Sequence, residues 1–103
     1  MIRHIVLFAL RADLSEKEIE ALFLVIGALR EKISVIQHFS FGKCDSPEKL
    51  NRQFTYGFTM DFLTAADRDY YLEHAAHQAV VKQHVLPALA NGFDSALVFD
   101  YEM

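Results

Sequence analysis

Alternating apolar residues at the start of the chain predict a β-strand over Ile2–Leu10. One face of this strand carries His4, Val6, Phe8 and Leu10, and the other carries Ile5, Leu7 and Ala9. Both faces are largely apolar. Such a strand needs packing partners on both sides of its sheet.

The next segment has helical spacing. Ser15 followed by Glu18 is a capping-box pattern, which satisfies free backbone N–H groups at the start of a helix. Apolar residues then recur three or four positions apart as far as about Lys32, namely Ile19, Leu22, Phe23, Ile26 and Leu29. The pattern predicts an amphipathic helix with one buried face.

Two further strands are predicted in the middle of the chain. Gln37–Lys43 places Phe39 and Phe41 on one side, and the polar stretch Cys44–Gln53 predicts a loop. The next strand is Thr55–Leu63. Its alternate residues on one face are Tyr56, Phe58, Met60 and Phe62.

A second helical region follows these strands. Thr64 and Asp67 predict its start, because a threonine at this position caps free N–H groups. The helical pattern continues to about Leu86, with room for an interruption at residues 74–76. Pro87 ends or kinks the region, since proline lacks the N–H that a helix interior requires.

The last predicted strand is Ala96–Tyr101, after a stop at Asn91–Gly92. It sets Leu97, Phe99 and Tyr101 opposite Val98 and Asp100. The order strand, helix, strand, strand, helix, strand predicts an α+β fold: a ferredoxin-like βαββαβ subunit with a four-stranded antiparallel sheet.

Right-handed crossovers place both helices of such a fold on the same face of the sheet. This chain then leaves the opposite face uncovered, although the first and last strands carry apolar residues on both faces. An exposed apolar patch of that size is typical of an interface. We therefore expect a homodimer that packs sheet face to sheet face.

Composition agrees with a single domain over residues 1–103, because 52% hydrophobic residues and nine Phe are sufficient for a core. A net charge of -4 with interspersed signs lacks the basic patch that nucleic acid requires. Ile5–Leu10 is too short to span a membrane, and the single Cys44 excludes an internal disulfide. We expect a cytoplasmic protein without nucleic-acid or membrane partners.

Candidate chemistry is concentrated in the second helical region. Tyr71, His74 and His77 lie within about two turns, and on a continuous helix they share one flank with His84. Imidazoles exchange protons near neutral pH. The histidine spacing is not a zinc signature, and the dispersed glycines form no phosphate-binding loop. Neither a metal nor a cofactor is expected.

Three segments resemble the stress-responsive dimeric α/β-barrel (Dabb) family: HIVLF at residues 4–8, YLEHAAHQ at 71–78 and LVFDYE at 97–102. The resemblance extends over nearly the whole chain. It implies a ferredoxin-like subunit whose sheet packs against that of a second copy to form an α/β barrel, in agreement with the unprotected strand faces.

The family includes a plant polyketide cyclase that closes an aromatic ring without a cofactor. The resemblance implies that His77 and Tyr71 stand at the positions of its catalytic histidine and tyrosine, and that His4 matches a histidine lining its cavity. Two positions depart from the pattern. Ala75 replaces the usual proline between the helix histidines, and Tyr56 stands where relatives have Thr-His.

The first functional hypothesis is a cofactor-independent cyclase, lyase or isomerase acting on an apolar, polyketide-like carbonyl compound. His77 takes a C–H proton beside the carbonyl, and Tyr71 or Tyr56 donates a hydrogen bond to the oxygen. His4 and Tyr56 line the substrate site. The alternative is a non-catalytic, stress-associated dimer that binds a hydrophobic ligand or has a filled cavity. Cofactor-free monooxygenation is a third option.

Overall fold

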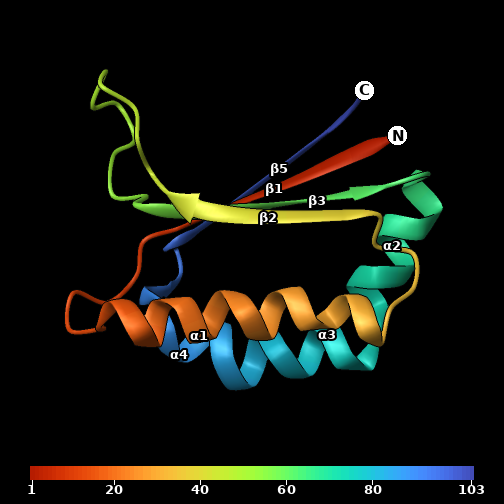
Figure 1. Cartoon of the computed structure of the whole chain (residues 1–103), viewed down its shortest axis with the longest axis horizontal. Helices are drawn as coiled ribbons and strands as arrows, with labels where there is room; N and C mark the ends of the chain where they lie inside the picture. The colour runs from red at the N-terminus through yellow and green to blue at the C-terminus, as the bar shows by residue number, and fades with distance from the viewer.

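The central layer of the protein is a four-stranded antiparallel sheet with strand order β2-β3-β1-β5. The computed structural model describes residues 1–103. The strands of this sheet are β1 (Ile2–Phe8), β2 (His38–Lys43), β3 (Tyr56–Phe62) and β5 (Ala96–Glu102). The α-helices are α1 (Glu16–Gly27), α2 (Ala65–Glu73), α3 (Ala75–Val80) and α4 (Leu86–Ala88). The helices cover one face of the sheet (Figure 1), which confirms the predicted ferredoxin-like α+β fold.

β1 runs through the middle of the sheet, and its alternation determines which side chains enter the core. Its buried residues are Ile2, His4, Val6 and Phe8. The strand is shorter than predicted, because beyond it Leu10 forms only an isolated bridge with Leu89. Leu89 precedes β4 (Ala90–Phe93), a short extended segment outside this sheet that the alternation pattern does not predict.

α1 begins as the sequence predicts. The hydroxyl of Ser15 accepts a hydrogen bond from the Glu18 N–H, and the Glu18 carboxylate accepts one from the Ser15 N–H. The α-helix ends at Gly27, and a 3₁₀ turn, η1 (Ala28–Glu31), continues it. Gly27 lies against a ring of β2, since a Cβ there would stand 2.7 Å from Cε2 of Phe39.

The second helical region is interrupted at His74, within the predicted interval. His74 has extended backbone angles (φ -65°, ψ 135°), and its Nδ1 accepts a hydrogen bond from the Ala76 N–H at 3.0 Å. This imidazole therefore caps α3. The single flank of histidines expected for a continuous helix does not form, because the chain changes direction between α2 and α3 (Figure 1).

A π-helical segment, η2 (Val81–Val85), connects α3 to α4. Pro87 follows it near the start of α4. Proline has no N–H, and its ring excludes the usual helical contact with the carbonyl four residues earlier. A wider turn directly before Pro87 accommodates both effects. Val81 and Val85 of this wider turn help to line a cavity between the helices and the sheet.

The second face of the sheet has no cover in this chain (Figure 1). Its apolar part is formed by side chains of β1 and β5, which alternate with those facing the helices: Ile5, Leu7, Leu97, Phe99 and Tyr101. Its polar part contains Arg3, which forms a bidentate ion pair with Asp61 at 2.9 and 3.0 Å.

None of the helices has the length and the apolar character that a membrane-spanning helix needs.

Candidate acid–base site

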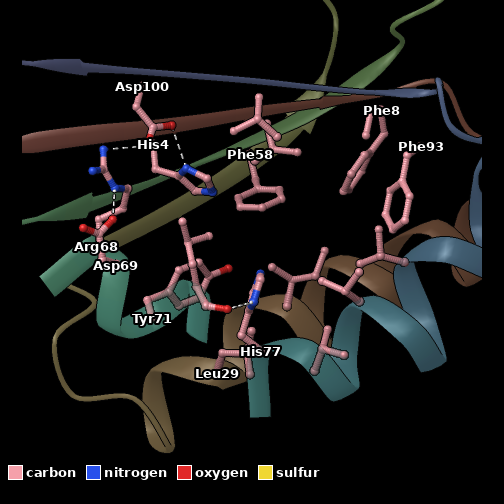
Figure 2. A pocket seen from close by; sticks show the side chains of 18 residues that line it. His4, Phe8, Leu29, Phe58, Arg68, Asp69, Tyr71, His77, Phe93 and Asp100 are labelled. Carbon is pink, nitrogen blue, oxygen red and sulfur yellow. Dashed lines mark hydrogen bonds and ion pairs between the residues drawn. The ribbon is translucent and has the colours of Figure 1, made fainter. Parts of the chain in front are cut away.

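A cavity of about 460 Å³ lies between the sheet and the second helical region. β1 and β5 form its upper wall in Figure 2, and α2, α3 and η2 form its lower wall. Most of its lining residues are hydrophobic. Ligand sites commonly have this size and an apolar lining with a few polar groups, and here the polar groups are those of His4, Arg68, Asp69, Tyr71, His77 and Asp100.

His77 lies in α3 and presents one ring nitrogen to this cavity. Its Nδ1 is 3.0 Å from the carbonyl oxygen of Leu72. A carbonyl oxygen only accepts, so Nδ1 carries the hydrogen and Nε2 has a free lone pair. Figure 2 shows the second nitrogen directed into the cavity. Burial lowers the pKa of His77, and this effect exceeds the opposing effect of the Leu72 hydrogen bond.

Tyr71 packs directly against His77, with ring centroids 4.5 Å apart. The side chain is almost completely buried, at 1% exposure, and its ring also contacts Phe62 and His4. Burial raises the pKa of the Tyr71 phenol well above its usual range. The hydroxyl is therefore a proton-bearing donor at neutral pH, and it points into the cavity beside His77 (Figure 2).

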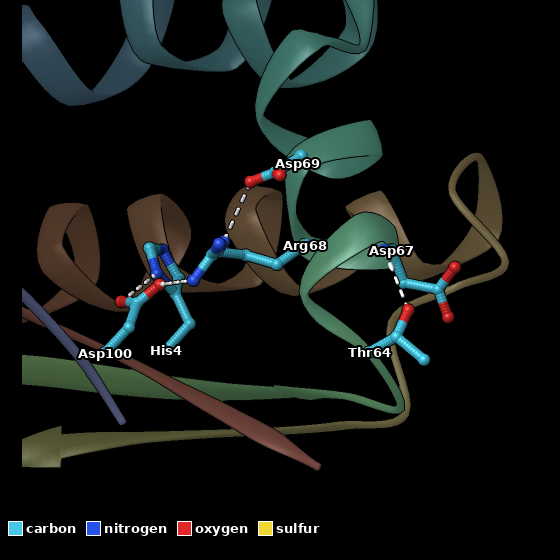
Figure 3. A network of polar contacts seen from close by, with 6 residues as sticks. All are labelled: His4, Thr64, Asp67, Arg68, Asp69 and Asp100. Atoms are coloured by element: carbon cyan, nitrogen blue, oxygen red, sulfur yellow. Dashed lines mark hydrogen bonds and ion pairs between the residues drawn. The ribbon is translucent and has the colours of Figure 1, made fainter. Parts of the chain in front are cut away.

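His4 occupies the opposite wall and is held by a carboxylate. Its Nδ1 lies 2.7 Å from Oδ1 of Asp100, its direct cross-strand partner in β5. An ionised carboxylate only accepts, so Nδ1 donates and Nε2 is left for the cavity. The other oxygen of Asp100 accepts from Nη1 of Arg68 at 3.2 Å, and Arg68 Nε donates to Asp69 at 3.0 Å (Figure 3).

The structure brings three of the four sequence-predicted site residues together and leaves Tyr56 elsewhere. Tyr56 does not line the cavity. It shares a strand face with Phe58, but lies farther along β3, where its ring packs 6.0 Å from that of Phe23. The sequence places Tyr56 on the correct face of its strand but gives no information on its distance from His77, and a role for Tyr56 in binding substrate stays a prediction.

Sequence reasoning missed Asp100, Arg68 and Asp69. One signal was present, because Asp100 interrupts the apolar run of the last predicted strand, Ala96–Tyr101. The connection to His4 depends on the pairing of β1 with β5, which joins residues 96 positions apart. The remaining histidines lie outside the cavity lining. No three or more His, Cys, Asp or Glu side chains are placed to share a metal ion.

Two imidazoles and a phenol thus surround an apolar cavity in a ferredoxin-like α+β subunit, which defines the class of the protein. The family model described as the stress responsive A/B barrel domain (Dabb) matches residues 2–103. The chain therefore belongs to the Dabb family, and the predicted resemblance is confirmed.

Solved structures of similar proteins agree with this assignment. An Arabidopsis thaliana protein is 25% identical and superimposes with a TM-score of 0.90, covering 100% of this chain and 95% of the other. A Bacteroides fragilis protein, described as dimeric with a ferredoxin-like fold and of unknown function, is 27% identical with a TM-score of 0.75 over 99% of this chain and 95% of its own.

A hydroxynitrile lyase from Passiflora edulis shares the fold at 22% identity, with a TM-score of 0.82 over 99% of this chain and 92% of the lyase. No protein of curated function matches the sequence. Similarity therefore establishes the family and the fold but no activity.

Proposed function

We propose that the protein is a cofactor-independent acid–base enzyme that acts on a small apolar carbonyl compound. The proposal rests on the packing of Tyr71 against His77, whose ring centroids are 4.5 Å apart, and on the free nitrogen of His77, which faces an apolar cavity. A neutral imidazole can accept a proton, and a protonated phenol beside it can donate a hydrogen bond.

In the proposed reaction, Nε2 of His77 takes a proton from the carbon next to the substrate carbonyl. The electron pair of the broken C–H bond moves into the enolate, whose oxygen accepts a hydrogen bond from Tyr71. His4, fixed by Asp100, lines the opposite wall of the cavity. The enolate then closes a ring, expels a leaving group or is reprotonated, which corresponds to cyclase, lyase or isomerase activity.

The hydroxynitrile lyase from Passiflora edulis has the same architecture, so this fold can accommodate an enzyme site. The choice among ring closure, elimination and isomerisation depends on the substrate. All three share the initial proton transfer to His77, so this step is the one to test.

We further propose that two copies pack through their uncovered sheet faces. Phe99 and Tyr101 are 58% and 43% exposed on this face. Phe99 pairs with Ile5 of β1, and Tyr101 pairs with Arg3. Burying such side chains stabilises association by about 25 cal/mol per Å² of apolar area, before association costs. The dimeric neighbours of the same fold support this arrangement.

The second candidate function is ligand binding without catalysis, which the mostly hydrophobic lining of the cavity favours. In that case a hydrophobic compound occupies the cavity, and His77 merely stabilises the junction of α2 and α3 through Leu72. The two candidates differ in one measurable property, because only the enzyme accelerates removal of a proton from carbon.

The test uses 4-butylacetophenone in deuterated water, and ¹H NMR follows the loss of the signal of its acetyl methyl group, which is next to the carbonyl. We expect the protein to accelerate exchange above the buffer rate. His77→Ala should lower the protein-catalysed exchange rate by about 100-fold or more. His84→Ala is the matched control, since His84 is exposed and outside the cavity lining. Exchange at the buffer rate in the unaltered protein, or full exchange in His77→Ala, contradicts the enzyme and favours the binding function.

The same assay separates the two tyrosines. Tyr71→Phe removes the proposed hydrogen bond to the enolate and retains the buried ring, so exchange should fall by about 100-fold. Tyr56→Phe should leave the exchange rate unchanged, because Tyr56 is outside the cavity. Circular dichroism of each variant checks that the fold is retained.

A further inference from the structure

The cavity has a charged end and a hydrocarbon end. Figure 2 shows Arg68, Asp69 and Asp100 together at one end and Phe8 and Phe93 at the other, with the two imidazoles between them. Phe93 is 65% exposed and therefore stands at the rim. A ligand that fills this space has its polar group near the imidazoles and its hydrocarbon part against the phenyl rings.

The charged end has no free cation to offer a ligand. Arg68 is the only Lys or Arg that lines the cavity. Its Nε donates to Asp69 and its Nη1 donates to Asp100 (Figure 3). Two carboxylates thus flank one guanidinium. The local charge is negative when both imidazoles are neutral and zero when one is protonated.

This arrangement discriminates by charge. A ligand carboxylate would lose hydration on entering the cavity and would meet two carboxylates rather than an unpaired cation. An uncharged carbonyl avoids both penalties, because it needs only hydrogen bonds from neutral donors such as the Tyr71 hydroxyl. The ketone and the acid of the same shape should therefore differ in affinity.

We propose that the cavity selects uncharged carbonyl compounds and excludes the carboxylates of the same shape. Asp69 and Asp100 produce this selection by neutralising Arg68 from both sides. The inference rests on the proposed function for the carbonyl head group, but it concerns binding and is measured without turnover.

The test compares two probes with the same ring and tail, 4-butylacetophenone and 4-butylbenzoate. Titration of ¹⁵N-histidine-labelled protein, followed by NMR of the imidazole nitrogens, gives a Kd for each probe. We expect the benzoate to bind at least about tenfold more weakly than the ketone, which corresponds to about 1.4 kcal/mol.

Three variants test the charges. Asp100→Asn should bring the ratio of the two Kd values close to one, because the Asp100 side chain is only 18% exposed and little screened. Asp69→Asn should reduce the ratio about two- to threefold, since Asp69 is 60% exposed. Asp67→Asn is the matched control. It removes the same charge from α2, but Asp67 does not line the cavity, so the ratio should be unchanged.

Equal affinities in the unaltered protein overturn the proposal, as does failure of the ketone to bind at millimolar concentration. An Asp67→Asn effect as large as that of Asp69→Asn also overturns it, because the selection would then reflect net charge alone. Selective ketone binding without proton exchange contradicts the proposed function and leaves the charge selection intact. Proton exchange combined with equally tight benzoate binding contradicts the charge selection and leaves the proposed function intact.

Discussion

Hydrogen bonds at single residues decide which imidazole nitrogens can react. Leu72 and Asp100 each accept from an Nδ1, which leaves Nε2 of His77 and of His4 for the cavity. The sequence favoured His77 and Tyr71 because they are close along one segment. Asp100 was not predicted, since only strand pairing brings it to His4.

His77 should titrate at a lower pH than a free imidazole. Its pKa is lowered by burial, so the neutral, proton-accepting form persists below the usual imidazole value of about 6.5. The exchange rate should therefore stay constant as pH falls through 6.5 and decrease only at lower pH. NMR titration of the imidazole and a pH–rate profile measure this directly. A midpoint at or above 6.5 contradicts burial as the dominant effect.

The lowered pKa of His77 also makes the stability of the protein depend on pH. The unfolded chain binds a proton at His77 more readily than the folded protein, so this residue's contribution to the unfolding free energy is present above about pH 6.5 and is lost as pH falls below it. His77→Ala should flatten that part of the stability curve, as measured by chemical denaturation.

At the scale of elements, local signals position the helices and a close contact positions two strands. The caps at Ser15 and Thr64 start α1 and α2, and the imidazole of His74 starts α3. Gly57 of β3 is different, because its importance depends on β1. A Cβ there would stand 2.7 Å from Cδ2 of Leu7 and 3.0 Å from the backbone oxygen of Val6.

Gly57→Ala should therefore destabilise the protein by about 1 to 2 kcal/mol, since a backbone oxygen cannot move away as a side chain can. Gly42→Ala is the matched control. Gly42 is the cross-strand partner of Gly57, but a Cβ at Gly42 would have no neighbour within 4 Å, so the change should be neutral or slightly stabilising. Urea denaturation measures both. Equal effects would contradict the steric explanation.

At the scale of the whole molecule, the uncovered face of the sheet dominates. Helices occupy one face, so the apolar residues of β1 and β5 on the other are buried only if another molecule covers them. This exposure follows from the right-handed connections of the fold. The same face contains the Arg3–Asp61 ion pair, which sets a polar boundary to the apolar patch.

Phe99→Lys should convert a sheet-to-sheet dimer into monomers, because it places a charge at the centre of the proposed contact. Leu24→Lys is the matched control: Leu24 is also 58% exposed, but it lies on α1, away from this face. Analytical ultracentrifugation gives the mass of each variant. A dimer that survives Phe99→Lys and is lost in Leu24→Lys would assign the interface to the helices.

The sequence by itself determined the order of the four sheet strands and the two helical regions, the α+β fold and the starts of α1 and α2, because periodicity and capping depend on neighbouring residues. It also indicated His4, Tyr71 and His77. Only the tertiary structure decided that Asp100 and Arg68 join His4 and that Tyr56 lies apart from them. The physical reason is that strand register and the distance between a sheet and a helix are set by contacts between residues far apart in the chain, which no local pattern records.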